Sequence, residues 1–125
     1  MDSNTNKENL EEAGMSVYQY IVDNCENCAD EMPSLIRKLT EVDTSGQFLA
    51  STARYLAAVD RQHFETWLAP LIEAAIDKDR ERRYIGSLLQ AIWGEDYADR
   101  VDELKASDNN FRRIYKRLYP QGNAM

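Results

Sequence analysis

Residues 64–93, FETWLAPLIEAAIDKDRERRYIGSLLQAIW, contain the longest run of helical periodicity in the chain. In the first half, apolar side chains recur every three or four positions and share one face of an amphipathic helix: Phe64, Trp67, Leu68, Leu71, Ile72, Ala75 and Ile76. The second half repeats the pattern with Tyr84, Ile85, Leu88, Leu89, Ile92 and Trp93. The charged segment between them, residues 78–83, offers no apolar side chain for burial. We predict a central helical hairpin over about residues 61–93, with its two apolar faces in contact.

The composition predicts the fold class. A chain of 125 residues is long enough for one domain with its own core. Five glycines, three prolines and few β-branched clusters leave little material for hairpin turns and strands. We therefore predict an all-α fold, a single compact multi-helical domain of five to seven helices around the hairpin. Two similar stretches, which begin at Arg54 and Arg83, are too weakly alike to indicate a repeat.

The two ends of the chain are predicted to lie outside this domain. Residues 1–14 are polar and end in a glycine, so we expect a disordered, flexible polar arm. Ser16 then has a side chain suited to an N-cap, and the first helix is expected to follow it. Residues 121–125 follow a proline and are expected to form a flexible tail. The all-helical domain is therefore assigned to residues 15–120.

Local signals predict where the other helices begin and end. Pro33 fits the first turn of a helix, because the amide that it lacks has no helical partner there. The sequence Asp-Thr-Ser-Gly at residues 43–46 ends that helix and caps the next one. Pro70 lies inside an unbroken apolar pattern, which favours a kink over a break. Gly94 suits a left-handed helix end, and Ser107 suits the N-cap of the last helix.

The charge of the chain is unevenly distributed. The formal net charge is −7, which argues against broad affinity for nucleic acid or anionic membranes. Residues 1–31 carry eight acidic residues and one basic residue, whereas residues 107–125 carry one acidic and four basic residues. One interpretation is that the acidic beginning and the basic end pair with each other inside the molecule. The other is that the basic end binds a partner.

The sequence predicts neither a membrane anchor nor a secretory signal. Nowhere do about 18 apolar residues follow one another, so no membrane-spanning helix is expected. The first 14 residues have neither the cationic start nor the apolar core of a signal peptide. We therefore expect a cytoplasmic protein.

The cysteine and histidine residues give only weak signals of chemistry. Cys25 and Cys28 form the only C-x-x-C sequence, and at this spacing both sulfur atoms share one helix face. A zinc site needs four ligands, but the chain has a single histidine, His63, and no second cysteine pair. We predict that the two cysteines are core residues and that no metal is bound. A redox pair remains the alternative.

No catalytic or cofactor site is predicted either. The acidic residues between positions 95 and 103 fit a solvated helix face better than paired catalytic carboxylates. No glycine-rich phosphate loop or nucleophile motif occurs in the sequence. An enzyme would need His63 joined to a carboxylate such as Glu65 or Glu73, and the spacing does not indicate such a site. The predicted protein is therefore non-enzymatic and has no cofactor.

The stretch SDNNFRRIYKRLY, residues 107–119, carries the strongest functional signal. Its periodicity predicts a helix with an inward face of Phe111, Ile114, Tyr115 and Leu118 and with basic rows elsewhere. Aromatic side chains beside arginine are enriched at protein interfaces. We therefore predict partner binding by Arg112, Arg113, Tyr115, Lys116, Arg117 and Tyr119. The first functional hypothesis is a small acidic, non-enzymatic interaction or regulatory module that binds another protein.

Other interpretations of this region stay open. Residues 97–119 are also compatible with a helix-turn-helix-like element that binds nucleic acid, with Asn109 and Asn110 near base edges. The net negative charge makes this the weaker hypothesis. Basic residues in a last helical turn also stabilise the helix dipole without any ligand. Self-association is a further hypothesis, with Trp67 and Trp93 as candidates for the centre of an uncovered apolar stripe.

Overall fold

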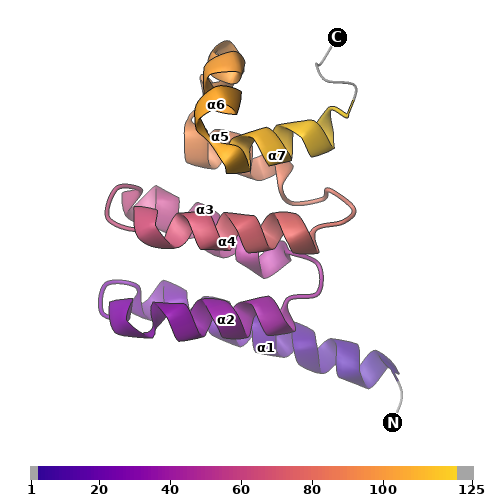
Figure 1. Cartoon of the computed structure of the whole chain (residues 1–125). Coiled ribbons are helices and arrows are strands. Elements are labelled where there is room, and N and C mark those ends of the chain that lie inside the picture. Colours follow the sequence, from indigo (N-terminus) through magenta and orange to yellow (C-terminus); the bar gives the residue numbers. More distant parts are fainter. Residues whose placement is uncertain (1–2, 121–125) are drawn as a thin grey trace.

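The structure is a computed structural model that describes residues 3–120, with the backbone alone for residues 3–8. Its α-helices are α1 (Ser3–Asn24), α2 (Met32–Val42), α3 (Gln47–Asp60), α4 (Glu65–Lys78), α5 (Gly86–Trp93), α6 (Val101–Ser107) and α7 (Asn109–Leu118) (Figure 1). Two 3-10 helices, η1 (Ala29–Glu31) and η2 (Tyr97–Arg100), precede α2 and α6. No strand occurs in this part of the chain, so the prediction of an all-α domain with five to seven helices is confirmed.

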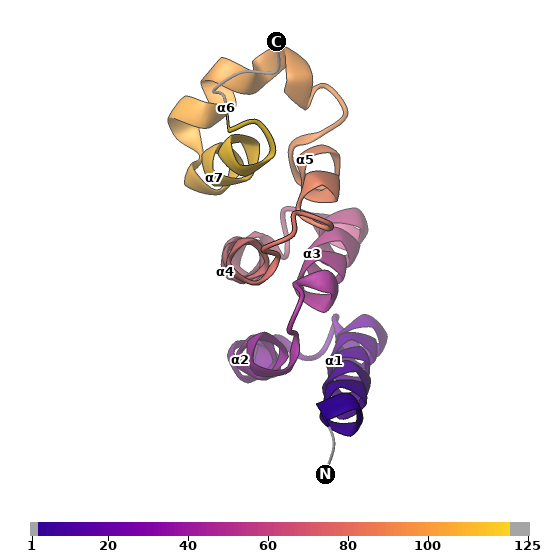
Figure 2. The same ribbon diagram turned by 90° about the vertical axis from the view of Figure 1, so that its right-hand side faces the viewer.

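The helices are stacked in layers of two. α1 lies beside α2, α3 beside α4, and α5 beside α7, and each layer packs on the next (Figure 1). Viewed along the helices, α1, α3 and α5 form one column, and α2, α4 and α7 form the other (Figure 2). This is the arrangement of an α-solenoid, in which each layer contacts only its neighbours. Helix α3 is central, because it packs against α1, α2, α4 and α5.

The predicted hairpin of residues 61–93 differs from the structure in its contacts. Both of its helices form, and α4 continues through Pro70 to Lys78 as expected. Their apolar faces, however, pack chiefly on α3 rather than on each other. The reason is topological, because the connection from α4 crosses to the other column before α5 begins (Figure 2). The periodicity identified the buried faces correctly but not their partner.

The first helix begins earlier than the sequence predicted. Residues 3–14, expected to be a flexible arm, belong to α1, and Ser16 is an exposed residue inside that helix. Gly14 does not break the helix, because it is buried where α1 approaches α3. A Cβ atom at this position would lie 2.5 Å from the ring of Phe48. The rest of the predicted arm, residues 1–2, and the predicted tail, residues 121–125, lie outside the described residues.

Two connections between layers are built around buried aspartates. Asp43 follows α2, and its carboxylate accepts hydrogen bonds from the amides of Ser45 (3.2 Å), Gly46 (3.0 Å) and Leu49 (2.8 Å). Asp79 follows α4, and its carboxylate accepts from the amides of Arg83 (2.9 Å), Tyr84 (2.7 Å) and Ile85 (2.9 Å). Each carboxylate satisfies amides that the start of the next helix leaves free. The charged segment 78–83 therefore does bury one side chain, contrary to what its composition suggested.

The two aspartates are 36 residues apart, and other features recur at the same spacing. Gly46 has a φ of +87°, and Arg82, at the matching position, is the one non-glycine residue with positive φ in the described chain, at +59°. Buried side chains also recur at positions 36 residues apart. The pairs are Cys28 and Phe64, Met32 and Leu68, Ile36 and Ile72, Leu39 and Ala75, Leu49 and Ile85, Thr52 and Leu88, Ala53 and Leu89, Leu56 and Ile92. The chain therefore contains a structural repeat of 36 residues, although no repeat was predicted from the sequence.

The C-terminal elements depart from this repeat. Gly94 ends α5 with a φ of +98°, positive as predicted, but its ψ of 160° is not that of a left-handed helical residue. The segment η2–α6 is then inserted before α7. Asp108, and not Ser107, is the N-cap of α7, since its carboxylate accepts from the amide of Phe111 at 3.1 Å. The same carboxylate accepts from Nε1 of Trp93 at 2.9 Å, and so joins α7 to the end of α5.

The length and hydropathy of the helices bear on membrane insertion. Among the described residues, no helix combines the length and the apolar character that a membrane crossing requires.

Candidate functional site

One side of α7 is fixed against α4. The guanidinium group of Arg117 donates to carbonyl oxygens at the end of α4, at 2.5 Å from Ile76, 3.2 Å from Asp79 and 3.4 Å from Arg80. Asp79 and Arg80 directly follow α4, and the Asp79 carbonyl also accepts from the amide of Arg82 at 3.1 Å. A cation at a helix C-terminus also stabilises the helix dipole.

The same side of α7 carries two further contacts. Arg113 forms an ion pair of 2.8 Å with Asp77, and Asn110 donates to the carbonyl of Ala69 at 3.2 Å. Arg113 and Arg117, both predicted as partner-binding residues, are thus engaged within the chain.

The other side of α7 faces outward and carries a different set of residues. Arg112 and Lys116 are exposed, and Tyr119 is partly exposed. The Tyr119 ring lies 4.7 Å from the ring of Tyr115, measured between centroids. Lys105 of α6 places its Nζ atom 5.5 Å from the centre of the Tyr115 ring. We call these five residues the basic–aromatic cluster.

The positions of these side chains follow from the packing beneath them. Phe111 is fully buried and contacts the ring of Trp93 at a centroid distance of 5.3 Å and the ring of Tyr115 at 5.7 Å. A row of aromatic rings therefore runs from the core to Tyr119 at the surface. Lys105, which sequence reasoning did not include, joins the cluster through the corner between α6 and α7. No periodicity within one helix could have indicated it, because the corner angle decides its place.

The charges of the cluster are not neutralised by the chain. Lys105, Arg112 and Lys116 form no ion pair with any side chain from residue 9 to residue 120. Arg112 donates to the backbone carbonyl of Lys105 at 3.4 Å and to the side-chain oxygen of Asn109, both of which are uncharged groups. Arg112 and Lys116 of α7, Lys105 of α6 and the partly exposed ring of Tyr119 therefore remain available on this surface, whereas the ring of Tyr115 is largely buried beneath them.

The acidic beginning and the basic end do not pair within the described chain. α1 and α7 lie at opposite ends of the stack, with the layer of α3 and α4 between them (Figure 1). This overturns the interpretation that the two ends neutralise each other inside the molecule. The acidic face of α1 is also left exposed, with Glu11, Glu12 and Asp23 at the surface.

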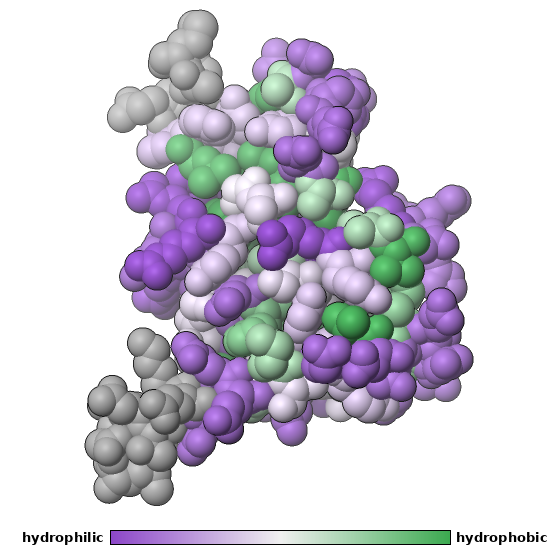
Figure 3. Space-filling view, turned by 180° about the vertical axis from the view of Figure 1, so that it is seen from behind, coloured by the Kyte–Doolittle hydropathy of each residue, from purple (hydrophilic) through white to green (hydrophobic). Residues whose placement is uncertain are grey.

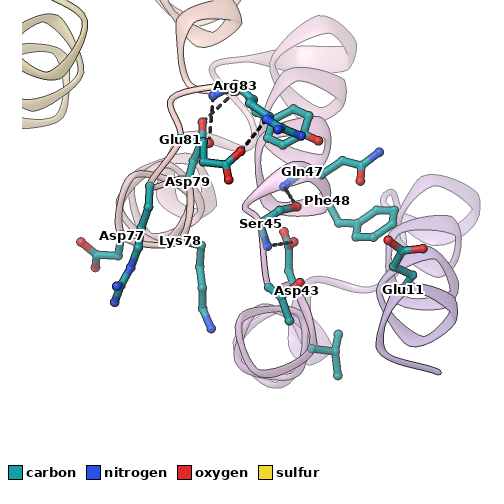
Figure 4. Close-up of a pocket in the computed structure, with 14 residues that line it drawn as sticks. Glu11, Asp43, Ser45, Gln47, Phe48, Asp77, Lys78, Asp79, Glu81 and Arg83 are labelled. Atoms are coloured by element: carbon teal, nitrogen blue, oxygen red, sulfur yellow. Dashed lines mark hydrogen bonds and ion pairs between the residues drawn. The ribbon is translucent and has the colours of Figure 1, made fainter. Parts of the chain in front are cut away.

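A hollow lies between the two aspartate loops. It has a volume of about 760 Å³ and is lined by Glu11 and by residues 42–45, 47–48, 77–81 and 83–84 (Figure 4). Its charged side chains are of both signs, and Arg83 is paired with Glu81 at 2.7 Å. Asp43 and Asp79 lie at its wall, but their carboxylates are occupied by backbone amides. No histidine or cysteine is among the residues that line it.

The cysteines lie in the core. Cys25 and Cys28 are buried free thiols, and Sγ of Cys28 lies 3.8 Å from Sδ of Met32. Burial, together with the charge of Glu31, raises the pKa of the Cys28 thiol. A raised pKa lowers the thiolate fraction, so this environment favours the core interpretation over a reactive redox pair.

The other side chains with potential chemistry do not form a site. His63 is exposed, with its ring edge-on to Phe64 at 4.7 Å. The side chains described from residue 9 onward include no group of three or more metal-ligating residues placed to hold an ion.

The structure also places the residues named for the alternative functions. Asn110, expected near base edges, faces α4, and only Asp108 separates α6 from α7. Trp93, a candidate centre for self-association, is 7% exposed and belongs to the core, while Trp67 is partly buried. On the face formed by α1, α3 and α5, apolar side chains occur in small separate areas rather than in one stripe (Figure 3).

In comparisons with known proteins, no family model, no curated protein and no solved structure matches the chain.

Proposed function

We propose that the chain is a non-enzymatic interaction module that binds an acidic segment of a partner protein on the basic–aromatic cluster. The observation that carries the proposal is the contrast between the two sides of α7. Arg113 and Arg117 are held by α4, whereas Arg112 and Lys116 point outward without an acidic partner among the described residues. Arginine beside tyrosine is the composition enriched at interface centres.

The physical terms favour a weak and fast interaction. An exposed ion pair contributes roughly 0.2–1 kcal/mol, so three cations alone would bind poorly. Burial of the Tyr119 ring adds about 25 cal/mol for each Å² of apolar surface removed from water. Together these contributions reach roughly 5 kcal/mol at most, so a Kd on the order of 0.1 mM or weaker follows from them. Because the rest of the molecule is acidic, the cluster is also a local positive feature that can orient an approaching acidic partner.

The test compares two charge-reversed variants as baits for partners from the native cell. Arg112→Glu with Lys116→Glu alters the cluster, and Arg37→Glu with Lys38→Glu is the matched control. The control residues are exposed on α2 and change the net charge by the same amount. We expect the wild type and the control to retain the same proteins, and the α7 variant to lose them. Equal retention by all three baits would reject the cluster as the binding surface.

A nuclease-treated arm of the same experiment separates protein from nucleic acid. Partners that are released by nuclease would support the nucleic-acid alternative, for which the packing of Asn110 against α4 gives no support. The setting that we propose is the cytoplasm. The two free cysteines fit a reducing compartment and support this assignment.

A further inference from the structure

The surface of α1 carries exposed carboxylates and an exposed methionine, which are complementary to the cations and the ring of the basic–aromatic cluster. Glu11 and Glu12 are adjacent, exposed and without an ion pair among the described residues. Met15 follows Glu12 by one helical turn and is 50% exposed, the largest exposed fraction among the large apolar side chains. An acidic pair and an uncovered thioether therefore lie on neighbouring turns of one helix.

The groups on α1 are complementary in kind to those on the outer side of α7. Glu12 and Met15 are three positions apart on α1, so the acid and the thioether are neighbours on the helix surface. On the other side of the contact, Arg112 and Lys116 supply positive charge from α7, and Tyr119, which directly follows α7, supplies a partly exposed ring. A methionine sulfur against an aromatic ring is itself a favourable contact.

The overall shape leaves both surfaces accessible but unable to meet within one molecule. The first turns of α1 extend beyond the end of α2, at the opposite end of the stack from α7 (Figure 1). An intramolecular contact is therefore impossible without dismantling the layers between them. A contact between two molecules requires no rearrangement.

We infer that α1 of one copy of this chain binds the basic–aromatic cluster of a second copy, head to tail. This inference rests on the proposed function and names its partner as a second copy of the chain. Glu11 and Glu12 contact Arg112 and Lys116, and Met15 contacts Tyr119. The contact joins two different surfaces, so each copy keeps one free acidic end and one free basic end. Short open chains form whose length increases with protein concentration.

The test is sedimentation equilibrium of the full chain over a range of concentrations, with complementary charge reversals. One variant carries Arg112→Glu and Lys116→Glu; the other carries Glu11→Lys and Glu12→Lys. Each variant alone brings like charges together and should associate at least tenfold more weakly than the wild type. The mixture restores opposite charges at the contact and should regain association.

The exposed pair Arg37→Glu and Lys38→Glu, at equal net charge to the α7 variant, should associate like the wild type. A wild-type chain that stays monomeric at millimolar concentration would overturn the inference. So would a mixture that associates no better than its two components. Circular dichroism of each variant checks that the helices are retained, as expected for exposed positions.

The outcomes separate the inference from the function on which it rests. If the chain does not self-associate but the α7 variant still loses its captured proteins, the cluster binds another protein and the second copy is excluded as its occupant. If the α7 reversal changes neither capture nor self-association, the proposed function itself is rejected.

Discussion

The loop at residues 43–46 and the loop at residues 79–82 do the same structural task with different sequences. Each begins with a buried aspartate and has a positive φ three residues later, at Gly46 in one and at Arg82 in the other. After glycine, α3 begins at once, at Gln47. After arginine, α5 begins only at Gly86, three positions later in the repeat, and is eight residues long against fourteen for α3.

The comparison separates what the two loops share, the aspartate junction, from what differs, the start of the next helix. The aspartate fixes the junction between layers, because in both loops it receives the amide six residues later, that of Leu49 or Ile85. Both loops have a positive φ at the matching position, yet the next helix starts three positions later after Arg82 than after Gly46. Where the helix starts late, at α5, the carboxylate accepts from three consecutive amides, those of residues 83–85.

The largest expected effect comes from removal of either aspartate. Asp43→Ala and Asp79→Ala each leave three backbone amides without their acceptor, two of them at buried positions for Asp43 and one for Asp79, and each should lower the free energy of unfolding by roughly 3–5 kcal/mol. Urea unfolding followed by circular dichroism measures this. Glu41→Ala, an exposed acid on α2, is the control and should stay within about 0.5 kcal/mol of the wild type. A large loss for one aspartate and a negligible one for the other would show that the two loops are not equivalent.

A reciprocal exchange at the positive-φ position should be strongly asymmetric. Gly46→Arg places a Cβ atom 3.0 Å from Cβ of Asp79 and 3.1 Å from the carbonyl oxygen of Ala75, and should cost roughly 2–3 kcal/mol. Arg82→Gly relieves about 1 kcal/mol of backbone strain but increases the freedom of the unfolded chain by a similar amount. It also removes an exposed hydrogen bond to the carbonyl of Arg117, so its net effect should be a loss of about 1 kcal/mol or less.

The same unfolding experiment applies to both variants. A Gly46→Arg variant as stable as Arg82→Gly would mean that the close contact between the two loops does not exist. The comparison between them would then lose its physical basis.

The two sides of α7 should differ by a smaller amount. Arg117→Ala removes three hydrogen bonds to carbonyls at the end of α4 and should destabilise the fold by roughly 2 kcal/mol. Its neighbour Lys116 faces outward, and Lys116→Ala should change stability by less than about 0.5 kcal/mol. Thermal unfolding of both variants at one protein concentration tests this. Equal losses would contradict the distinction between an inner and an outer basic row.

The smallest expected effect concerns the pH dependence at Cys28, which matches Phe64 in the repeat. Burial raises the pKa of this thiol above its ordinary value of 9.0, so the folded state holds its proton more tightly than the unfolded state does. The stabilisation is complete below pH 9 and is lost as the pH rises through the folded-state pKa. Unfolding measured between pH 7 and 10.5 should therefore show a steeper alkaline decline for the wild type than for Cys28→Ala. Rapid alkylation of native Cys28 at pH 7 would instead indicate a reactive thiol.

Much of the fold could be predicted from the sequence because local signals and helical periodicity were consistent. Pro33 and residues 43–46 located the ends of α2 and the start of α3 to within about a residue. Gly14 misled the prediction, since its small size serves packing against Phe48 and not chain reversal. Ser107 and Asp108 both have capping side chains, and only the contact of Asp108 with Trp93 decides between them.

The repeat and the site were harder to predict for a different reason. The repeat preserves burial but not residue type, as Leu39 and Ala75 illustrate, so direct comparison of letters does not reveal it. On α7, the inner and outer basic residues occur at similar helical spacings. Periodicity separates basic from apolar positions, but it cannot state which basic row meets a neighbouring helix. That information resides in the position of α4, which the local sequence of α7 does not contain.

A unit of 36 residues with equivalent junctions makes the molecule extensible by tandem duplication. A second copy of residues 44–79, inserted after Asp79, would enter and leave through aspartate junctions of the same kind. The new layer would contact only the layers above and below it, and neither terminal helix would change. Since packed helices are spaced by about 8–10 Å, each insertion would move the acidic and the basic ends apart by that distance. The reach of the molecule could thus be lengthened stepwise, with the chemistry of both ends unchanged.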